Sequence, residues 1–114
     1  MPHILDEIVA AKRRELERSR TVVPLTRLEE QIEEQRPPLN LAGALMGDSV
    51  RIIGEVKKAS PVKGLLSPDF DPVERAISYA DNGAAAISVL TNVDHFQGSL
   101  GDLEAVREAI HPRG

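Results

Sequence analysis

The chain has 114 residues, of which 41% are apolar and only 3% aromatic, so it is long enough for one domain, or part of one, with an aliphatic core. Its net charge of −4 argues against nucleic acid or an anionic membrane as the main partner. It contains no cysteine, which excludes disulfides and zinc–thiolate sites, and no apolar run approaches the ~20 residues of a membrane span, a composition consistent with a cytoplasmic protein.

The chain up to residue 48 has the periodicity of helices. Residues 4–18 predict an amphipathic helix with its apolar residues near one stripe: Ile4, Leu5, Ile8, Val9 and Leu16. A second, shorter helix is predicted within residues 24–36, with Thr26 as its N-cap. Residues 39–47 predict one or two further helical turns. Such segments are typical of helices that dock on a core.

From residue 50 onward the pattern changes to alternating strands and helices. The segment 50–56 predicts a strand because four of its residues are β-branched: Val50, Ile52, Ile53 and Val56. The segment 84–90 predicts a second strand, apolar on both faces. Residues 60–70 hold two Ser-Pro pairs and predict a loop between the first strand and the next helix.

Two helices of this second half carry clear end signals. Asp71 is the predicted N-cap of the first, with Pro72 in the first helical position, and Asn82-Gly83 is its predicted stop. Ser99 is the predicted N-cap of the last helix, which His111-Pro112 ends. Two strands some thirty residues apart with a helix between them predict a parallel, right-handed crossover. The fold class is therefore α/β, either a doubly wound sheet or a (β/α)8 barrel.

The stretch GEVKKASPVKGLL places charges inside a strand. Alternation puts Ile53, Glu55 and Lys57 on one face, with Ile52 and Val56 on the other. In a barrel, Ile52 and Val56 would face the helix layer, whereas Glu55 and Lys57 would project inward near the catalytic mouth. Such a pair keeps the lysine protonated, ready to hold a carboxylate or phosphate or to donate a proton. The alternative is a strand-end ion pair with solvated lysines.

The residues that follow favour an anionic ligand. Ser60-Pro61 and Lys63-Gly64 add a hydroxyl, a second cation and a flexible backbone at the same mouth. The three histidines show no metal-ligand spacing, and His95 is interpreted as a loop residue.

Two longer strings resemble a known family. GEVKKASPVKGLLSPDFDP and YADNGAAAISVLTNVDHFQGSLGDLEAVREAI look like the N-terminal part of indole-3-glycerol-phosphate synthase, and ILDEIVAAKRRELE and RPPLNLAGAL resemble its extra N-terminal helices. The resemblance implies an N-terminal fragment of a (β/α)8 TIM barrel, with a helical extension over residues 1–48 and two β-α units over residues 49–114. It also implies a phosphorylated, anionic substrate and no cofactor.

Residue by residue, the resemblance implies a site. Glu55 and Lys57 match two active-site residues: the lysine binds and polarises the substrate, and the glutamate tunes the neighbouring charges. Ser60 and Pro61 match the substrate loop, and Phe96 matches an aromatic residue that packs on the substrate, although from sequence alone it could equally be a loop anchor.

The reaction that the resemblance implies is a decarboxylating ring closure that forms an indole. The family places its general acid, a lysine, on the third strand and its general base, a glutamate, on a later one, so we expect the 114-residue chain alone to be inactive. Two other readings stay open: a quarter-barrel module that associates with its own copies or complements another fragment, and a different phosphate-binding barrel enzyme. Strands that are apolar on both faces and have open edges favour a homo-oligomer.

Overall fold

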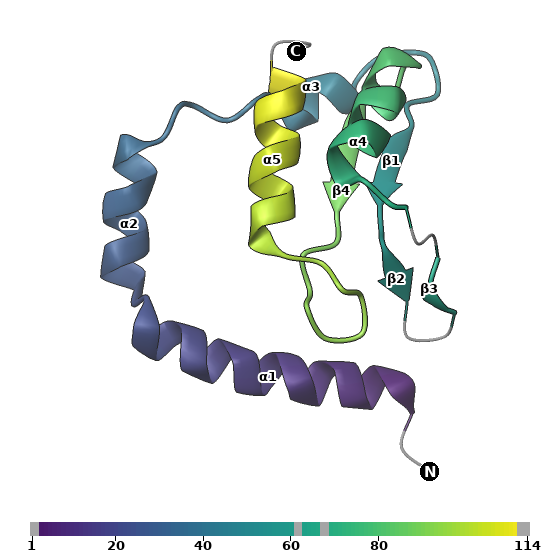
Figure 1. Ribbon diagram of the computed structural model, residues 1–114. Coiled ribbons are helices and arrows are strands. Elements are labelled where there is room, and N and C mark those ends of the chain that lie inside the picture. The colour runs from purple at the N-terminus through teal and green to yellow at the C-terminus, as the bar shows by residue number, and fades with distance from the viewer. Residues whose placement is uncertain (1–2, 61–62, 67–68, 112–114) are drawn as a thin grey trace. The chain divides into compact units, whose positions relative to one another are not determined.

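The computed structural model describes residues 3–60, 63–66 and 69–111 (Figure 1). Its helices and strands, in chain order, are α1 (Ile4–Val22), α2 (Leu25–Glu34), α3 (Leu41–Leu45), β1 (Ile53–Val56), β2 (Ala59–Ser60), β3 (Gly64–Leu65), α4 (Pro72–Asp81), β4 (Ala86–Val89) and α5 (Leu100–Ile110). Contacts divide the chain into two compact units, residues 1–38 and residues 39–114.

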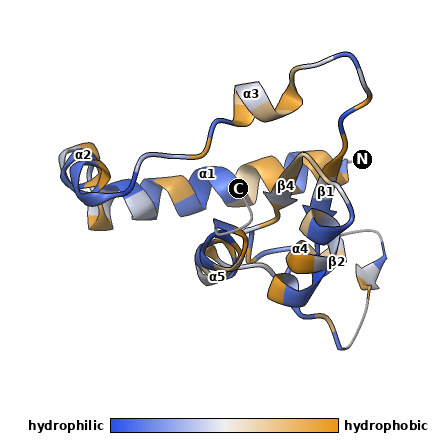
Figure 2. Ribbon diagram, turned by 90° about the horizontal axis from the view of Figure 1, so that it is seen from above, coloured by the Kyte–Doolittle hydropathy of each residue, from blue (hydrophilic) through white to orange (hydrophobic). Residues whose placement is uncertain are grey.

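The first unit contains the two helices α1 and α2. His3 caps α1: its Nδ1 accepts a hydrogen bond from the Leu5 amide, and the Asp6 carboxylate accepts one from the His3 amide. The helix runs four residues past the predicted end, to Val22. Figure 2 shows hydrophobic and hydrophilic residues interleaved along both helices, as the periodicity predicts. Neither helix has a buried residue.

The predicted cap of the second helix is wrong. The N-cap of α2 is Pro24, and Thr26 lies inside the first turn. The proline has φ of −70° and ψ of 164°, an extended conformation from which the helix starts directly, and its carbonyl accepts hydrogen bonds from the Arg27 and Leu28 amides. The helix therefore begins without a side-chain cap, two residues before Thr26.

The second unit is built on a two-stranded parallel sheet. β1 pairs with β4 in the register Ile53↔Ala86 to Val56↔Val89, and α4 lies between them in the chain. This confirms the predicted α/β class and the parallel pair. Both strands are shorter than predicted, and Ile52 is 64% exposed just before β1. Alternation puts Ile52 on the same side as Val56, but the helix layer covers the sheet from Gly54 onward, where Tyr79 packs. That Ile52 faces the helix layer in a complete barrel therefore stays a prediction.

The core of this unit lies between the sheet and one helix layer. Val56, Ala76 and Val106 are buried together, one each from β1, α4 and α5. Five partly buried residues pack against them: Phe70, Tyr79, Ile87, Val89 and Ile110. Figure 1 shows α4 and α5 side by side over the strands, and the two helices contact each other directly. The three fully buried residues are aliphatic, as the composition predicts, and two of the residues packed against them, Phe70 and Tyr79, are aromatic.

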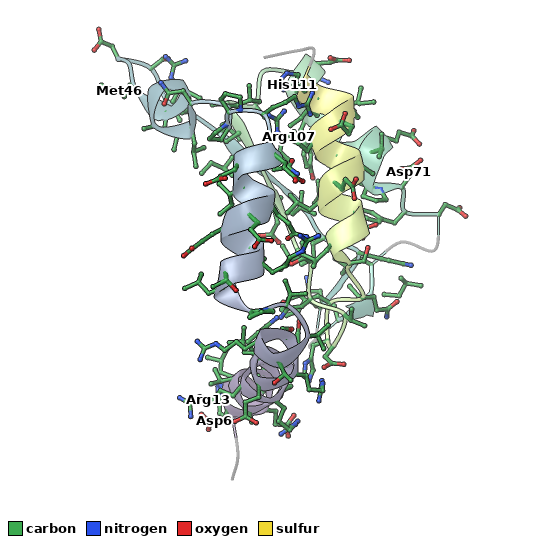
Figure 3. The ribbon with its side chains drawn as sticks, turned by 90° about the vertical axis from the view of Figure 1, so that its left-hand side faces the viewer. Asp6, Arg13, Met46, Asp71, Arg107 and His111 are labelled. Carbon is green, nitrogen blue, oxygen red and sulfur yellow. The ribbon has the colours of Figure 1, made fainter. Side chains whose placement is uncertain are left out.

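The predicted ends of α4 and α5 are confirmed where they can be seen. Asp71 Oδ1 accepts hydrogen bonds from the Val73 and Glu74 amides at 3.0 and 3.3 Å, and Pro72 opens α4. Gly83 has a φ of 97°, the left-handed conformation that ends a helix. Ser99 Oγ accepts a hydrogen bond from the Asp102 amide at 3.1 Å. Figure 3 shows Asp71 at the start of α4. Pro112 lies outside the described residues.

The segment predicted as a loop contains a short hairpin. β2 and β3 pair antiparallel in the register Ala59↔Leu65 and Ser60↔Gly64, and the Leu66 amide donates to the Lys58 carbonyl at 3.0 Å. Strands of two residues are too short to produce a period of two in the sequence, which is why the pattern missed them. Gly64, the first residue of β3, has a φ of 66°, a left-handed conformation that favours glycine.

Candidate active site at the carboxyl end of β1

Glu55 and Lys57 form the ion pair that the sequence predicts. The Lys57 Nζ lies 3.2 Å from the Glu55 Oε1, with side chains that are 35% and 50% exposed respectively. The two residues share a strand face because they are two positions apart at the carboxyl end of β1. At this exposure, water screens the pair and it adds little to folding stability. The pair places an ammonium group beside a carboxylate on this face of the strand.

The opposite face of β1 explains why this pair stays accessible. Val56, between Glu55 and Lys57, is 2% exposed and packs in the core with α4 and α5. Alternation therefore turns Glu55 and Lys57 away from the helix layer. The face that carries them is open among the described residues, because the sheet there has only two strands and its helices cover the other side.

Ser88 is a polar residue of this face that the sequence interpretation missed. It is the register partner of Glu55 across the β1–β4 pair, and it is exposed. Directly paired residues of parallel strands point to the same side of the sheet, so the hydroxyl and the carboxylate share one surface. The string AISV contains the pattern that could have predicted this position, a polar residue between two apolar ones. In the structure Ile87 and Val89 face the core, and Ser88 between them does not.

Ser60 lies three residues beyond Lys57, at the end of β2. Its Oγ accepts a hydrogen bond from the Lys63 amide at 3.0 Å, which ties the turn of the hairpin. Ala59 beside it is 1% exposed and anchors the hairpin. The hydroxyl keeps its donor hydrogen and a lone pair for another partner. Pro61 lies outside the described residues, so its predicted place in the substrate loop stays a prediction.

Phe96 lies in a loop after β4 whose backbone shape is tightly defined. The Gly98 amide donates to the Asn92 carbonyl at 2.7 Å, and the Phe96 amide donates to the Asp94 carbonyl at 2.8 Å. Phe96 itself is half-buried. The structure thus places it in an ordered turn, as either a substrate contact or a loop anchor would require.

The residues on both sides of Phe96 have left-handed backbones. His95 has a φ of 68° and Gln97 a φ of 54°, conformations that cost non-glycine residues free energy and cluster at functional sites. Gly98 is buried, and a Cβ at this position would lie 2.0 Å from the Leu90 carbonyl oxygen. The loop therefore depends on a close backbone approach at Gly98. His95 lies in this loop, as interpreted from the sequence.

A groove of about 520 Å³ lies elsewhere in the second unit. Its walls are α3 with the residues before it, the end of α4, the start of β4, and Ile110: Leu39, Asn40, Leu41, Gly43, Ala44, Ala80, Ala84, Ala85, Ala86, Ile87 and Ile110. None of these is ionisable, and none belongs to the predicted site. We therefore keep the candidate site at the Glu55–Lys57 pair, where the charged groups are.

Within the described ranges 3–60, 63–66 and 69–111, no three histidine, aspartate or glutamate side chains gather closely enough to hold a metal ion. Over the same residues, no helix combines the length and apolar character needed to cross a membrane.

Comparison with known proteins identifies the family. A family model described as indole-3-glycerol phosphate synthase matches residues 5–113. An indole-3-glycerol phosphate synthase of Dehalococcoides mccartyi is 50% identical over 107 residues, which cover 93% of this chain and 41% of that protein. Those of Roseiflexus sp. and Rippkaea orientalis are 47% and 44% identical, over 96% and 95% of this chain and 41% and 38% of their own lengths.

These alignments cover nearly the whole chain but less than half of each relative. The chain spans about 41% of the length of the first of these curated relatives. The match includes both the helical residues and the β-α units, because it runs from residue 5 to residue 113. The resemblance predicted from the strings around Glu55 and Phe96 is thus confirmed, and the chain belongs to the indole-3-glycerol phosphate synthase family.

Proposed function

We propose that this chain supplies part of the active site of an indole-3-glycerol phosphate synthase, an enzyme of tryptophan biosynthesis. The reaction converts 1-(2-carboxyphenylamino)-1-deoxyribulose 5-phosphate by decarboxylation, ring closure and dehydration, without a cofactor. The observation that carries the proposal is the Glu55–Lys57 ion pair, 3.2 Å long, on the open face of β1 in a chain of this family.

The fold proposed for the complete enzyme is a (β/α)8 barrel. β1 and β4 would be the first two of its eight parallel strands, with residues 1–48 as a helical extension and residues 49–114 as two β-α units. In such a barrel the helix layer lies outside, so the face with Glu55 and Ser88 becomes the interior. The carboxyl ends of the strands then form the catalytic mouth, where Lys57 lies.

Lys57 would bind and polarise the substrate in this arrangement. The Lys57 ammonium group lies 3.2 Å from the Glu55 carboxylate, and it would meet the anionic carboxylate or phosphate of the substrate as that substrate enters. Glu55 would tune the charge and direction of the lysine. Ser60, Pro61 and Phe96 would contact the substrate from the two loops that follow β1 and β4.

The first test is the removal of the Lys57 ammonium group in a complete barrel that carries residues 1–114. In Lys57→Ala, turnover should fall by roughly 10²–10⁴, the usual value of a positioned acid–base or electrostatic group. Lys58→Ala is the matched control, because Lys58 is a neighbouring lysine that alternation points to the other side of the chain. Turnover of Lys57→Ala within twofold of the unsubstituted enzyme would remove Lys57 from the site.

The second test concerns the 114-residue chain alone, which we expect to be inactive. The resemblance places the general acid and the general base on later strands, and these strands are not among the 114 residues. Indole-3-glycerol phosphate formed by the purified chain, and lost in Lys57→Ala, would contradict this expectation.

A second candidate role is self-association or complementation with another barrel fragment. Many large apolar side chains are exposed, among them Ile53 on the face of Glu55, at 54%. The two-stranded sheet also leaves one edge of each strand without a partner in the described part of the chain. We propose that the isolated chain pairs with a second copy. Light scattering across a tenfold dilution should then show a dimer or larger assembly; a concentration-independent monomer mass would exclude it.

A further inference from the structure

Ser88 is the single polar residue of β4, and neither packing nor strand preference accounts for it. Ile87 and Val89 on either side of it pack against the core cluster, whereas Ser88 is exposed. Strands favour β-branched residues, so β4 would form at least as well with threonine or valine at this position. The serine therefore calls for an explanation outside the folding of its own strand.

Two other serines of the same unit use their hydroxyls to shape the backbone. Ser60 Oγ accepts a hydrogen bond from the Lys63 amide at 3.0 Å in the hairpin, and Ser99 Oγ accepts one from the Asp102 amide at 3.1 Å at the start of α5. Within residues 3–60, 63–66 and 69–111, the structure shows no such bond for the Ser88 hydroxyl. Ser88 therefore does not hold a turn or a helix end in the described part of the chain.

The strand register brings Ser88 next to Glu55. The two residues are direct partners in the β1–β4 pair, whose strands lie side by side in Figure 1. Paired strands lie about 4.8 Å apart, and their paired side chains point to the same side of the sheet. Glu55 Oε1 contacts the Lys57 Nζ at 3.2 Å, and the carboxylate has a second oxygen, Oε2, that can accept a hydrogen bond. A serine hydroxyl is a donor of suitable length for that oxygen.

Closure of a barrel would keep this arrangement. Further strands would pair with the outer edges of β1 and β4, but the face on which a side chain lies is set by alternation in its own strand and by the β1–β4 register. The helix layer would stay on the side of Val56, so Glu55 and Ser88 would both point into the interior, near the carboxyl ends of their strands. Because the effective dielectric constant is lower there than in water, a hydrogen bond to a carboxylate is stronger.

We propose that Ser88 is a positioning residue of the active site, whose hydroxyl donates a hydrogen bond to the Glu55 carboxylate. The inference rests on the proposed function. With Lys57 on one carboxylate oxygen and Ser88 on the other, the carboxylate is held from two strands in one orientation, and the Lys57 ammonium group is oriented with it. The loss of one hydrogen bond to a charged group corresponds to a factor of about 10–100.

The kinetic test is Ser88→Ala in a complete barrel that carries residues 1–114. Ser78→Ala is the matched control, since it removes an exposed hydroxyl of α4, in the helix layer. We expect kcat of Ser88→Ala to fall about 10–100-fold with KM within about threefold, whereas Ser78→Ala keeps both constants. A purely structural Ser88 would lower the unfolding temperature and leave kcat unchanged, which would overturn the inference. A raised KM with unchanged kcat would also overturn it, because the hydroxyl would then bind the substrate directly.

A crystal structure of the same barrel tests the contact itself. The Ser88 Oγ should lie about 2.5–3.0 Å from a Glu55 carboxylate oxygen, the usual length of a hydrogen bond from a hydroxyl. In Ser88→Ala, the Glu55 carboxylate should change its orientation, and in Ser78→Ala it should not. A distance beyond about 3.5 Å in the unsubstituted barrel would overturn the inference even if kcat falls.

The two proposals fail in distinguishable ways. An unsubstituted barrel without synthase activity overturns the proposed function, and the catalytic meaning of Ser88 with it. An active barrel in which Ser88→Ala matches Ser78→Ala overturns only the role of Ser88.

Discussion

Residues 1–38 and residues 39–111 both contain amphipathic helices, but only the second region has helices with buried side chains. α1 is the longest helix, with 19 residues, and neither it nor α2 has a buried residue. α4 and α5 have only 10 and 11 residues, yet Ala76 and Val106 on them are 0% and 2% exposed. Length does not explain the difference, since α2 also has 10 residues; α4 and α5 bury side chains because they share a core with β1.

The difference shows that an amphipathic stripe is not itself a source of stability. A stripe contributes only when another element removes it from water, at roughly 25 cal/mol per Å² of apolar surface. In α4 and α5 the sheet does this. In α2 the stripe remains open, with Leu25, Leu28 and Ile32 between 44% and 69% exposed. Substitutions within residues 39–111 should therefore lower the free energy of unfolding more than similar substitutions within residues 1–38.

The largest loss of folding stability is expected for a substitution at Gly98, in the second region. A methyl group in Gly98→Ala would meet the Leu90 carbonyl oxygen at 2.0 Å, and backbone cannot move aside as a flexible side chain can. We expect a loss of about 3 kcal/mol in the free energy of unfolding, the upper end of the usual cost of overpacking. Urea unfolding followed by circular dichroism measures it.

Gly101→Ala provides the matched control for this prediction. The new Cβ would lie 3.6 Å from the Ser99 Oγ, an ordinary contact, and the site is inside α5. Replacing a helical glycine by alanine should stabilise the protein by up to about 1 kcal/mol. Equal stabilities for the two variants would mean that the loop after β4 relaxes freely, and that it is not a fixed support for Phe96.

A pair of truncations compares the two regions directly. Val106→Ala removes two methyl groups from a side chain that is 2% exposed, and should cost about 2–3 kcal/mol from lost burial and the remaining cavity. Leu28→Ala removes more carbon from a side chain that is 44% exposed, and should change stability by no more than about 0.5 kcal/mol. A loss at Leu28 equal to that at Val106 would show that α2 is buried in solution, by a second copy or another partner.

Much of the second region could be predicted because its signals are local. Asp71, Pro72 and Ser99 mark the starts of α4 and α5 through side-chain chemistry that acts within one turn. The shared face of Glu55 and Lys57 follows from alternation alone, and their ion pair confirms it. The parallel pairing of β1 with β4 follows from the spacing of two strands around a helix.

The features that were missed depend on contacts between distant residues. Ser88 joins the face of Glu55 only through the strand register, and Tyr79 reaches Glu55 from 24 positions along the chain. Ile52 carries a strong strand signal and is nevertheless 64% exposed. Thr26 has the residue type of an N-cap, but the neighbouring Pro24 begins the helix first. The local sequence predicts a conformation or a burial for such residues, but contacts with distant residues determine the one that the fold adopts.

The smallest changes in folding stability are expected for substitutions that remove polar contacts at the surface of each region. Asp71→Ala removes the acceptor of two α4 amides at 3.0 and 3.3 Å, and a lost N-cap should cost about 1 kcal/mol. Arg27→Ala removes an ion pair in α2 whose side chains are 59% and 66% exposed, and should change stability by less than about 0.5 kcal/mol. Thermal unfolding at low and high salt separates the two, because salt screens the exposed ion pair more than the cap. If Arg27→Ala is the costlier change, α2 has a charged partner that removes Arg27 from water, and the contrast between the two regions does not hold in solution.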